Sequence, residues 1–281
     1  MKQTAGARLI VHADDFGLSE AVNRGVLAAH ENGIVTSTSI MAGGDAFAHA
    51  VALAKSHPSL DVGVHLTLTE QRPVADSVPT LVDGQGRFAP HAAQFALRYL
   101  RGSVALADVR AELAAQIRRV REHGIAPTHL DGHQHVHVLP GVAGVVAELA
   151  RENGIRAVRV PAERVHGYML GDLSRLKRVA EQLAVGALAG LSPLAPLRRV
   201  DRFVGFYFGG RLTEQNLRTV LMRLPRRATV ELMCHPGLDD PSSAHADWGY
   251  SWAAETAALS SPAIRGLLAE RGVQLIGYRD V

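Results

Sequence analysis

Short apolar runs alternate with amphipathic segments along most of the 281-residue chain. Apolar runs of about four to eight residues indicate buried strands, whereas apolar positions that recur every three or four residues indicate helices. The expected strands are residues 8–13, 34–41, 60–68, 128–133, 157–161, 228–234 and 273–278. The expected helices are 19–32, 46–56, 108–123 and 141–154, with one more before each of the last two strands.

Strands that alternate with helices predict parallel βαβ units and an α/β fold. Seven or so units over this length favour a single-domain, distorted (β/α) TIM-like barrel spanning residues 1–281 over an open sheet. Residues 70–105 are expected to be loop-rich because prolines and glycines recur there. Residues 162–212 are harder to assign and are treated as an insertion or cap.

The composition is that of a globular protein with a sizeable core, because 47% of the residues are hydrophobic and 20% are charged. The net charge is +3, and no basic run with interleaved aromatics indicates a nucleic-acid partner. Cys234 is the one cysteine, which suits a reducing compartment. The beginning of the chain lacks the pattern of a signal peptide, and no apolar stretch reaches the ~20 residues of a membrane helix. We therefore expect a cytoplasmic protein.

The segment HLDGHQHVH, residues 129–137, places four histidines and one aspartate in nine residues. The aspartate and all four histidines occupy odd positions, so an extended chain would point them to one side. A strand of ordinary length cannot keep all of them in one site. We expect the middle members at the strand's mouth and His135 and His137 in the following loop.

In α/β barrels the chemistry lies at the carboxyl ends of the strands. Asp14 and Asp15 end the first expected strand, His65 lies in the third, and His235 ends a late one. These side chains and the histidine run are therefore expected to converge on one face.

Simpler explanations exist for each residue alone. A lone histidine such as His65 is more often a hydrogen-bonded core residue, and Asp14-Asp15 before Phe16-Gly17 is compatible with an ordinary turn. For the histidine run 129–137 as a whole, an ordinary structural role is a weak explanation, because an imidazole is costly to bury without partners. Taken together, the residues favour a metal site.

One carboxylate and two imidazoles would leave open positions on a divalent ion, as in catalytic sites, and a bound water becomes nucleophilic near neutral pH. A second carboxylate beside the first could act as general base. Asp14 and Asp15 can share one site only if the chain turns there, and Phe16-Gly17 is where we expect the turn. Cys234 should point away from His235, because neighbours on a strand face opposite ways.

Several spaced motifs resemble the YdjC-like carbohydrate deacetylase family, which includes chitooligosaccharide deacetylases and the hopanoid-associated HpnK group. The resemblance is weakest over residues 70–105 and 162–225. The motifs are HADDFGLSEAVNRGV (12–26), GIVTSTSIM (33–41), VGVHLTLT (62–69), PTHLDGHQHVH (127–137), ELMCHPG (231–237) and GYRDV (277–281).

The resemblance implies a barrel similar to polysaccharide deacetylases and hydrolysis of an N-acetyl group from an amino sugar, with release of acetate. It implies Asp15, His65 and His133 as metal ligands and Asp14 as the catalytic base. It also implies Mg²⁺, whereas ligand softness fits Zn²⁺ or another transition ion better. His235 is the candidate that protonates the departing amine.

Three further residues are candidates for supporting or substrate-binding roles. Asp131 could orient a ligand histidine, and His129 belongs to the same strand. Arg159 could hold a substrate oxygen, although a surface arginine in an ion pair is the commoner use of such a residue.

The segment FVGFYFGGR, residues 203–211, resembles the hopanoid-associated group, which implies an N-acetylglucosaminyl lipid as substrate. Residues 176–197 are apolar, rich in small residues and flanked by basic ones, so they could rest on the inner face of a membrane. A barrel helix followed by a proline-containing loop is the alternative for this segment.

Other functions remain open at this stage. They are a chitooligosaccharide deacetylase, another metal-dependent barrel enzyme, and a metal- or glycan-binding protein without activity; a homodimer is also open. The sequence has no phosphate-binding glycine loop of the P-loop or GxGxxG type, which disfavours another metal-dependent barrel enzyme.

Overall fold

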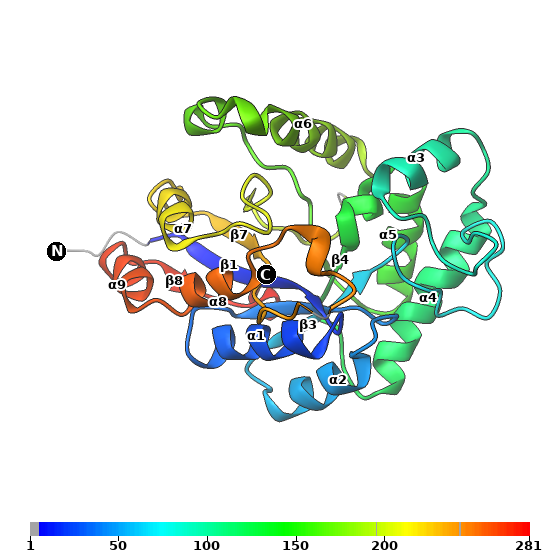
Figure 1. Ribbon diagram of the computed structural model, residues 1–281, viewed down its shortest axis with the longest axis horizontal. Coiled ribbons are helices and arrows are strands. Elements are labelled where there is room, and N and C mark those ends of the chain that lie inside the picture. Colours follow the sequence, from blue (N-terminus) through cyan, green and yellow to red (C-terminus); the bar gives the residue numbers. More distant parts are fainter. Residues whose placement is uncertain (1–5, 195, 242) are drawn as a thin grey trace.

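The computed structural model describes residues 6–194, 196–241 and 243–281. Its centre is a curved parallel sheet with helices around the outside (Figure 1). The strands are β1 (Arg8–Phe16), β2 (Ser37–Ile40), β3 (Asp61–Leu66), β4 (His129–Gly132), β5 (Ala157–Val158), β6 (Arg202–Val204), β7 (Thr229–Cys234) and β8 (Gln274–Leu275). The helices are α1 (Glu20–Glu31), α2 (Phe47–Ser56), α3 (Ala92–Leu100), α4 (Leu106–Glu122), α5 (Val142–Glu152), α6 (Leu176–Leu191), α7 (Glu214–Leu221), α8 (Trp252–Leu259) and α9 (Pro262–Glu270).

The strand order is β5-β4-β3-β2-β1-β7-β6, and all of these pairs are parallel. β1 is central because both of its edges are used. β7 pairs along Arg8 to Ala13, while β8 and β2 share the opposite edge, β8 at its beginning and β2 from His12 onward.

β5 and β6, at the two ends of the sheet, do not pair with each other in the described structure; the isolated bridges Ala157↔Arg198 and Glu163↔Phe203 lie between them. The sheet therefore curls into a barrel that lacks a continuous ladder at one seam. The expectation of a distorted α/β barrel is confirmed.

Most predicted elements are present, with shifted boundaries. Helix α1 begins where expected, because the Ser19 hydroxyl accepts a hydrogen bond from the Val22 backbone N–H at 3.2 Å. Strand β1 is longer than expected and runs through Asp14 and Asp15, whereas β2, β5 and β8 are shorter. Helix α3 lies in the region expected to be loop, and the three-residue β6 was not predicted.

Alternation along β1 explains how the interior of the barrel is divided. Leu9, Val11 and Ala13 belong to the large core between the sheet and the helices. Ile10 points the other way, into a small apolar cluster with Tyr278. His12 and Asp14 follow on the same side as Ile10, so the barrel interior is apolar at the strand beginnings and polar toward the strand ends.

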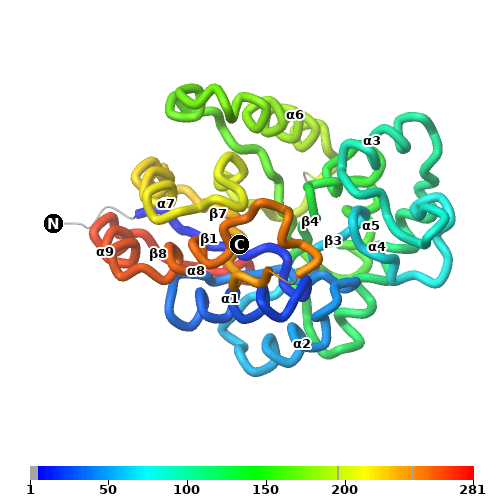
Figure 2. The backbone as a smooth tube through the Cα atoms, in the orientation of Figure 1, coloured from blue at the N-terminus to red at the C-terminus, as the bar shows by residue number. Residues whose placement is uncertain are grey.

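Residues 162–212, expected to form an insertion or cap, contain α6 and β6. Helix α6 lies at one side of the molecule and α2 at the opposite side, as the backbone trace shows (Figure 2). Within the described ranges, no helix is long and apolar enough to span a membrane.

Candidate metal and catalytic site

A cavity of about 600 Å³ lies at the carboxyl ends of the central strands. Five of the residues singled out from the sequence line it: Asp14, Asp15, His65, His133 and His235. They come from β1 and β3 and from the residues that directly follow β4 and β7, so the structure brings together groups that lie up to 221 positions apart.

Three of these residues form a compact group, here called the cavity triad: Asp15, His65 and His133. Asp15 Oδ1 lies 3.0 Å from His133 Nδ1 and 3.3 Å from His65 Nε2. All three side chains are buried, and their ligand atoms lie within 4.8 Å of one another. The second oxygen of Asp15, Oδ2, is buried and has no hydrogen-bond partner among the residues that the structure describes. A buried carboxylate oxygen without a donor is expensive, and a cation bound between the two imidazoles would satisfy it.

The backbone around the cavity triad is strained. Asp15, Glu70, Gln134 and His135 all have positive φ, between 51° and 65°, and among the described residues Arg227 alone shares this feature outside glycine. Such strain concentrates at functional sites. The turn that brings Asp14 and Asp15 to one cavity therefore begins at Asp15 itself, one residue before the expected Phe16-Gly17.

A carboxylate holds the far nitrogen of each imidazole in the cavity triad. His65 Nδ1 lies 3.0 Å from Asp131 Oδ1, and His133 Nε2 lies 2.6 Å from Glu70 Oε2. If each of these nitrogens donates its proton to the carboxylate, the nitrogens that face Asp15 are left as acceptors, the form that binds metal. Asp131 thus stands where the sequence interpretation put it, and Glu70 is a partner that the sequence did not reveal.

These carboxylates also favour positive charge on the two rings. Burial opposes protonation of His65, but Asp131 outweighs it and raises the pKa to about 10. Burial likewise opposes protonation of His133, but Asp15 raises the pKa to about 9. Burial would raise the pKa of Asp15, yet His133 holds it well below its usual value. The electrostatics of the cavity triad therefore suit a bound cation.

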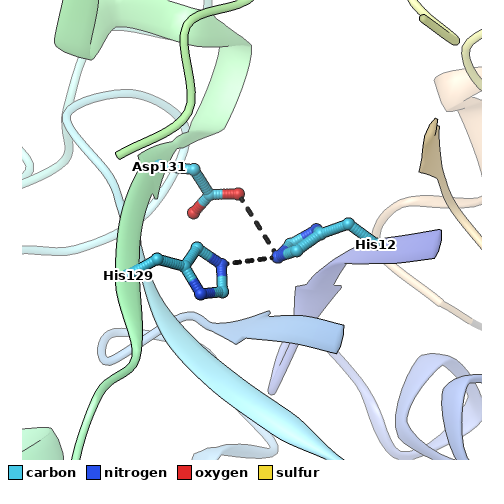
Figure 3. A group of neighbouring side chains, drawn as sticks. All are labelled: His12, His129 and Asp131. Carbon is cyan, nitrogen blue, oxygen red and sulfur yellow. Dashed lines mark hydrogen bonds and ion pairs between the residues drawn. The ribbon is translucent and has the colours of Figure 1, made fainter. Parts of the chain in front are cut away.

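A second group with the same chemical make-up, here called the interior triad, consists of His12, His129 and Asp131 (Figure 3). His12 Nε2 lies 2.7 Å from His129 Nε2 and 3.9 Å from Asp131 Oδ2. The His129 ring also stacks on Tyr278 at 3.8 Å between centroids. It lies so close to β3 that a Cβ on Gly63 would meet it at 2.5 Å. Burial holds the pKa of His129 well below its ordinary value.

Arg159 lies between the two triads and is fully buried. Its Nη1 and Nη2 donate to the two oxygens of Asp14 at 2.7 and 2.6 Å, and Nη1 lies 3.0 Å from Asp131 Oδ2. Its Nε donates to Glu231 at 2.7 Å. The alternative of a surface arginine is wrong, because Arg159 is buried and contacts three buried carboxylates. Arg159 is not among the described residues that line the cavity.

Asp14 combines exposure to the cavity with firm orientation. Besides Arg159, its Oδ1 contacts His12 Nδ1 at 2.9 Å. Burial favours the neutral acid, but Arg159 outweighs it and holds the pKa of Asp14 well below the usual value. Asp14 is thus an ionised carboxylate whose position beside the cavity triad is fixed. His12, which the sequence interpretation did not single out, lies two residues earlier on the same face of β1, and this spacing was the available signal.

His235 borders the cavity with a buried Nδ1 that has no hydrogen-bond partner in the described part of the chain. Its backbone N–H donates to Glu255 Oε2 at 2.6 Å, and its ring contacts Tyr250 edge-on at 4.9 Å. Cys234 faces away, as expected: its thiol donates to the His12 carbonyl at 3.2 Å, and burial raises its pKa well above the ordinary value.

The histidine run divides among these environments. His129 belongs to β4 and the barrel interior, and His133 begins the 3-10 segment His133–Val138 at the cavity. His135 lines the cavity, and His137 Nε2 donates to the Arg159 carbonyl at 3.1 Å. The later members therefore lie in the connection after the strand, where the spacing predicted them. The whole arrangement places a candidate cation site, an oriented carboxylate and an imidazole on one cavity.

Comparison with known proteins adds an independent line of evidence. Residues 8–270 match the model of the family described as YdjC-like protein. A carbohydrate deacetylase of Geobacillus stearothermophilus is 37% identical over 96% of both chains. One of Mus musculus is 37% identical over 98% of this chain and 94% of the relative. A solved structure from Enterococcus faecalis V583, named for a proposed role in cellobiose-phosphate cleavage, superimposes with a TM-score of 0.75 at 27% identity, covering 98% of this chain and 99% of that one.

Proposed function

The chain belongs to the family of YdjC-like proteins, and from this premise we propose that it is a metal-dependent carbohydrate N-deacetylase. It would hydrolyse the N-acetyl group of a substrate that contains N-acetylglucosamine and release acetate. Relatives named carbohydrate deacetylase that cover nearly the whole chain support this proposal. The observation that carries it is the cavity triad, with its partnerless Asp15 oxygen, beside an oriented Asp14.

Asp15, His65 and His133 would hold one divalent ion, since the buried Asp15 Oδ2 and the two acceptor nitrogens fit such an ion. When bound, the ion supplies a Lewis acid for the acetyl carbonyl and lowers the pKa of a water molecule. One oxygen and two nitrogen ligands suit Zn²⁺ or another transition ion, whereas the family resemblance implies Mg²⁺.

Asp14 is the proposed general base. The Arg159 guanidinium holds both of its oxygens, so the carboxylate stays ionised and cannot rotate away from the cavity. It takes one proton from the attacking water as the oxygen bonds to the acetyl carbon. The same carboxylate distinguishes an enzyme from a protein that only binds a metal or a glycan, because metal binding alone does not need it.

His235 is the proposed general acid. It lines the same cavity as Asp14, and its ring Nδ1 has no partner in the described structure. As the carbon–nitrogen bond breaks, the amine nitrogen takes a proton from this ring, and the sugar leaves as a free amine while acetate remains.

A lipid-linked amino sugar, such as an N-acetylglucosaminyl hopanoid, is our proposed substrate class. Helix α6 supports it, because Lys177, Arg178, Glu181 and Val185 of that helix line the cavity while other side chains of the helix are apolar and exposed. A substrate whose sugar enters the cavity would leave its lipid beside that helix. Chitooligosaccharides are the competing substrate class.

The test is acetate release by metal-reconstituted protein, with chitobiose-type oligomers and an N-acetylglucosaminyl hopanoid offered side by side. Release from the lipid alone supports the lipid-linked substrate, and release from the oligomers alone contradicts it but keeps the deacetylase. Release from neither substrate, with Zn²⁺, Mg²⁺ and other divalent ions tried, contradicts both proposals.

Asp14→Asn separates catalysis from binding. We expect metal affinity to be retained and turnover to fall about 10²- to 10⁴-fold, the usual effect of removing a general base. Metal binding is measured by calorimetry and turnover by acetate release, with a thermal melt to confirm that the variant folds. A fully active Asp14→Asn protein would show that the base is another residue.

A further inference from the structure

Helix α6 exposes an apolar face to solvent. Positions 176, 180, 183, 184, 187 and 191 are all exposed, and their spacing places them on one side of the helix. All six are leucine or alanine. The opposite side buries Val179, Gln182 and Ala189 against the molecule. A surface helix normally shows the reverse pattern, with charged residues toward water.

The exposed leucines are concentrated in this part of the chain. Eleven large hydrophobic residues are exposed in the described structure, and five of them fall between positions 170 and 191. Leu173 is 78% exposed, Leu183 56% and Leu191 81%. Scattered exposed leucines need no explanation, but a contiguous row marks an interaction surface. Figure 1 shows α6 lying outermost on its side of the molecule.

The same region carries the net positive charge of the protein. Residues 162–212 contain eight basic and four acidic residues, a net charge of +4, whereas the entire chain is +3. The rest of the molecule is therefore slightly acidic. Arg164 and Lys177 are exposed, and of the four acidic residues in this segment Glu163 is buried, so its charge does not offset them at the surface.

We propose that the leucine face of α6 docks on the surface of an anionic lipid bilayer. An apolar row flanked by basic side chains matches the interface of such a bilayer, where the leucines enter the acyl boundary and the cations meet lipid phosphates. A second copy of the chain fits less well, because a two-fold contact through this face would place two regions of charge +4 against each other.

Docking in this orientation has a consequence for the cavity. Lys177 and Arg178 of α6 line the cavity and also begin the helix that would touch lipid. A lipid-linked molecule could then present its polar part to the cavity without leaving the bilayer. The docking itself does not depend on the proposed reaction, and its measurement is binding to vesicles, so the two proposals can fail separately.

The experiment is flotation of the full-length protein with vesicles of phosphatidylcholine, with and without phosphatidylglycerol. We expect binding to the anionic vesicles, little binding to the neutral ones, and weaker binding as the salt concentration rises. The variant that combines Leu176→Ser, Leu183→Ser and Leu191→Ser should bind at least about tenfold more weakly, because three inserting side chains of the α6 face are lost.

The matched control combines Leu97→Ser, Leu100→Ser and Met222→Ser, which replace comparably exposed apolar residues on α3 and beside α7. It should bind vesicles like the unsubstituted protein, and both variants should keep their melting temperature. Absence of binding by the intact protein would overturn the proposal, as would equal weakening in the control. A dimer that the α6 variant alone converts to monomer, without vesicle binding, would assign the face to a second copy instead.

Discussion

The cavity triad and the interior triad have the same composition, one aspartate and two histidines, and each holds its ligand atoms within 4.8 Å. Both are buried, and both span β1 and the β4 region of the barrel. Only the cavity triad borders the cavity. Residue types and spacing therefore do not distinguish a metal site from a structural cluster in this protein.

The hydrogen-bond partners of the side-chain atoms distinguish the two triads. In the interior triad, His12 Nε2 meets His129 Nε2, and His129 Nδ1 meets Thr128 Oγ1 at 2.9 Å. Asp131 receives a hydrogen bond from Ser39 and lies beside the Arg159 guanidinium, which already supplies a positive charge. In the described structure no arginine contacts the cavity triad, and Asp15 Oδ2 is left without a partner. The interior triad is therefore satisfied by its own partners, whereas the cavity triad keeps one buried oxygen that a bound cation would satisfy.

The largest effect on stability should come from removing the buried positive charge of Arg159. Arg159→Met leaves Asp14, Asp131 and Glu231 as buried carboxylates without their counter-ion. Loss of one partner from a buried ion pair costs about 3–5 kcal/mol, so the free energy of unfolding should fall by at least that much in urea titrations.

Arg159→Lys is the matched control. It keeps the charge but replaces a planar fork with a single ammonium, so we expect an intermediate loss of stability. An Arg159→Met protein as stable as the original would show that the interior network is not structural, and the contrast between the triads would fail.

Glu70→Gln tests the cavity triad. The amide still reaches His133 Nε2 but no longer provides the negative charge, so metal affinity should fall about 10- to 100-fold, with one ion bound per chain. Stability should change little, because the Glu70 side chain is 16% exposed and water can replace the contact. Calorimetric titration of the metal-free protein measures both affinity and stoichiometry.

Glu152→Gln on α5 is the control, since it also removes a carboxylate from an ion pair, in this case with Arg110. Neither Glu152 nor Arg110 is among the described residues that line the cavity. The metal affinity of this variant should match that of the unsubstituted protein. A second bound ion that persists in Glu70→Gln would identify the interior triad as a metal site and break the distinction drawn above.

The sequence was sufficient to predict which strand ends meet, but not what lies beneath them. Asp14, Asp15, His65 and His235 follow or end recognisable apolar runs, and the parallel barrel then brings them to one face. Asp131 was a candidate to orient a histidine of the site, and the structure places it beside His65 on the neighbouring strand β3. The catalytic and metal-binding roles of these residues stay predictions.

Arg159 and Glu70 show why the rest was out of reach. Arg159 is buried because carboxylates from β1, β4 and β7 surround it, and this depends on contacts as far as 145 positions apart. Glu70 reaches His133 through a left-handed backbone conformation in a segment that the sequence indicated only as loop. Local patterns carry neither kind of information.

The smallest effect concerns pH, and here the two triads should act in opposite directions. In the metal-free protein the pKa values of His65, about 10, and His133, about 9, exceed the ordinary 6.5. Their stabilising contribution is complete below about pH 6.5 and is lost as the pH rises through 9 to 10. The lowered pKa of His129 works in the other sense, because its contribution is present above about pH 6.5 and is lost as the pH falls. The melting temperature of metal-free protein should therefore drop by a few degrees between about pH 7 and 10, measured by scanning calorimetry.

His133→Gln should flatten that drop, because a ring that is protonated at neutral pH is replaced by a group that does not titrate. An equal drop in the variant would mean that the cavity imidazoles are already neutral without metal, and that the carboxylates around them do not favour a cation as strongly as their geometry indicates.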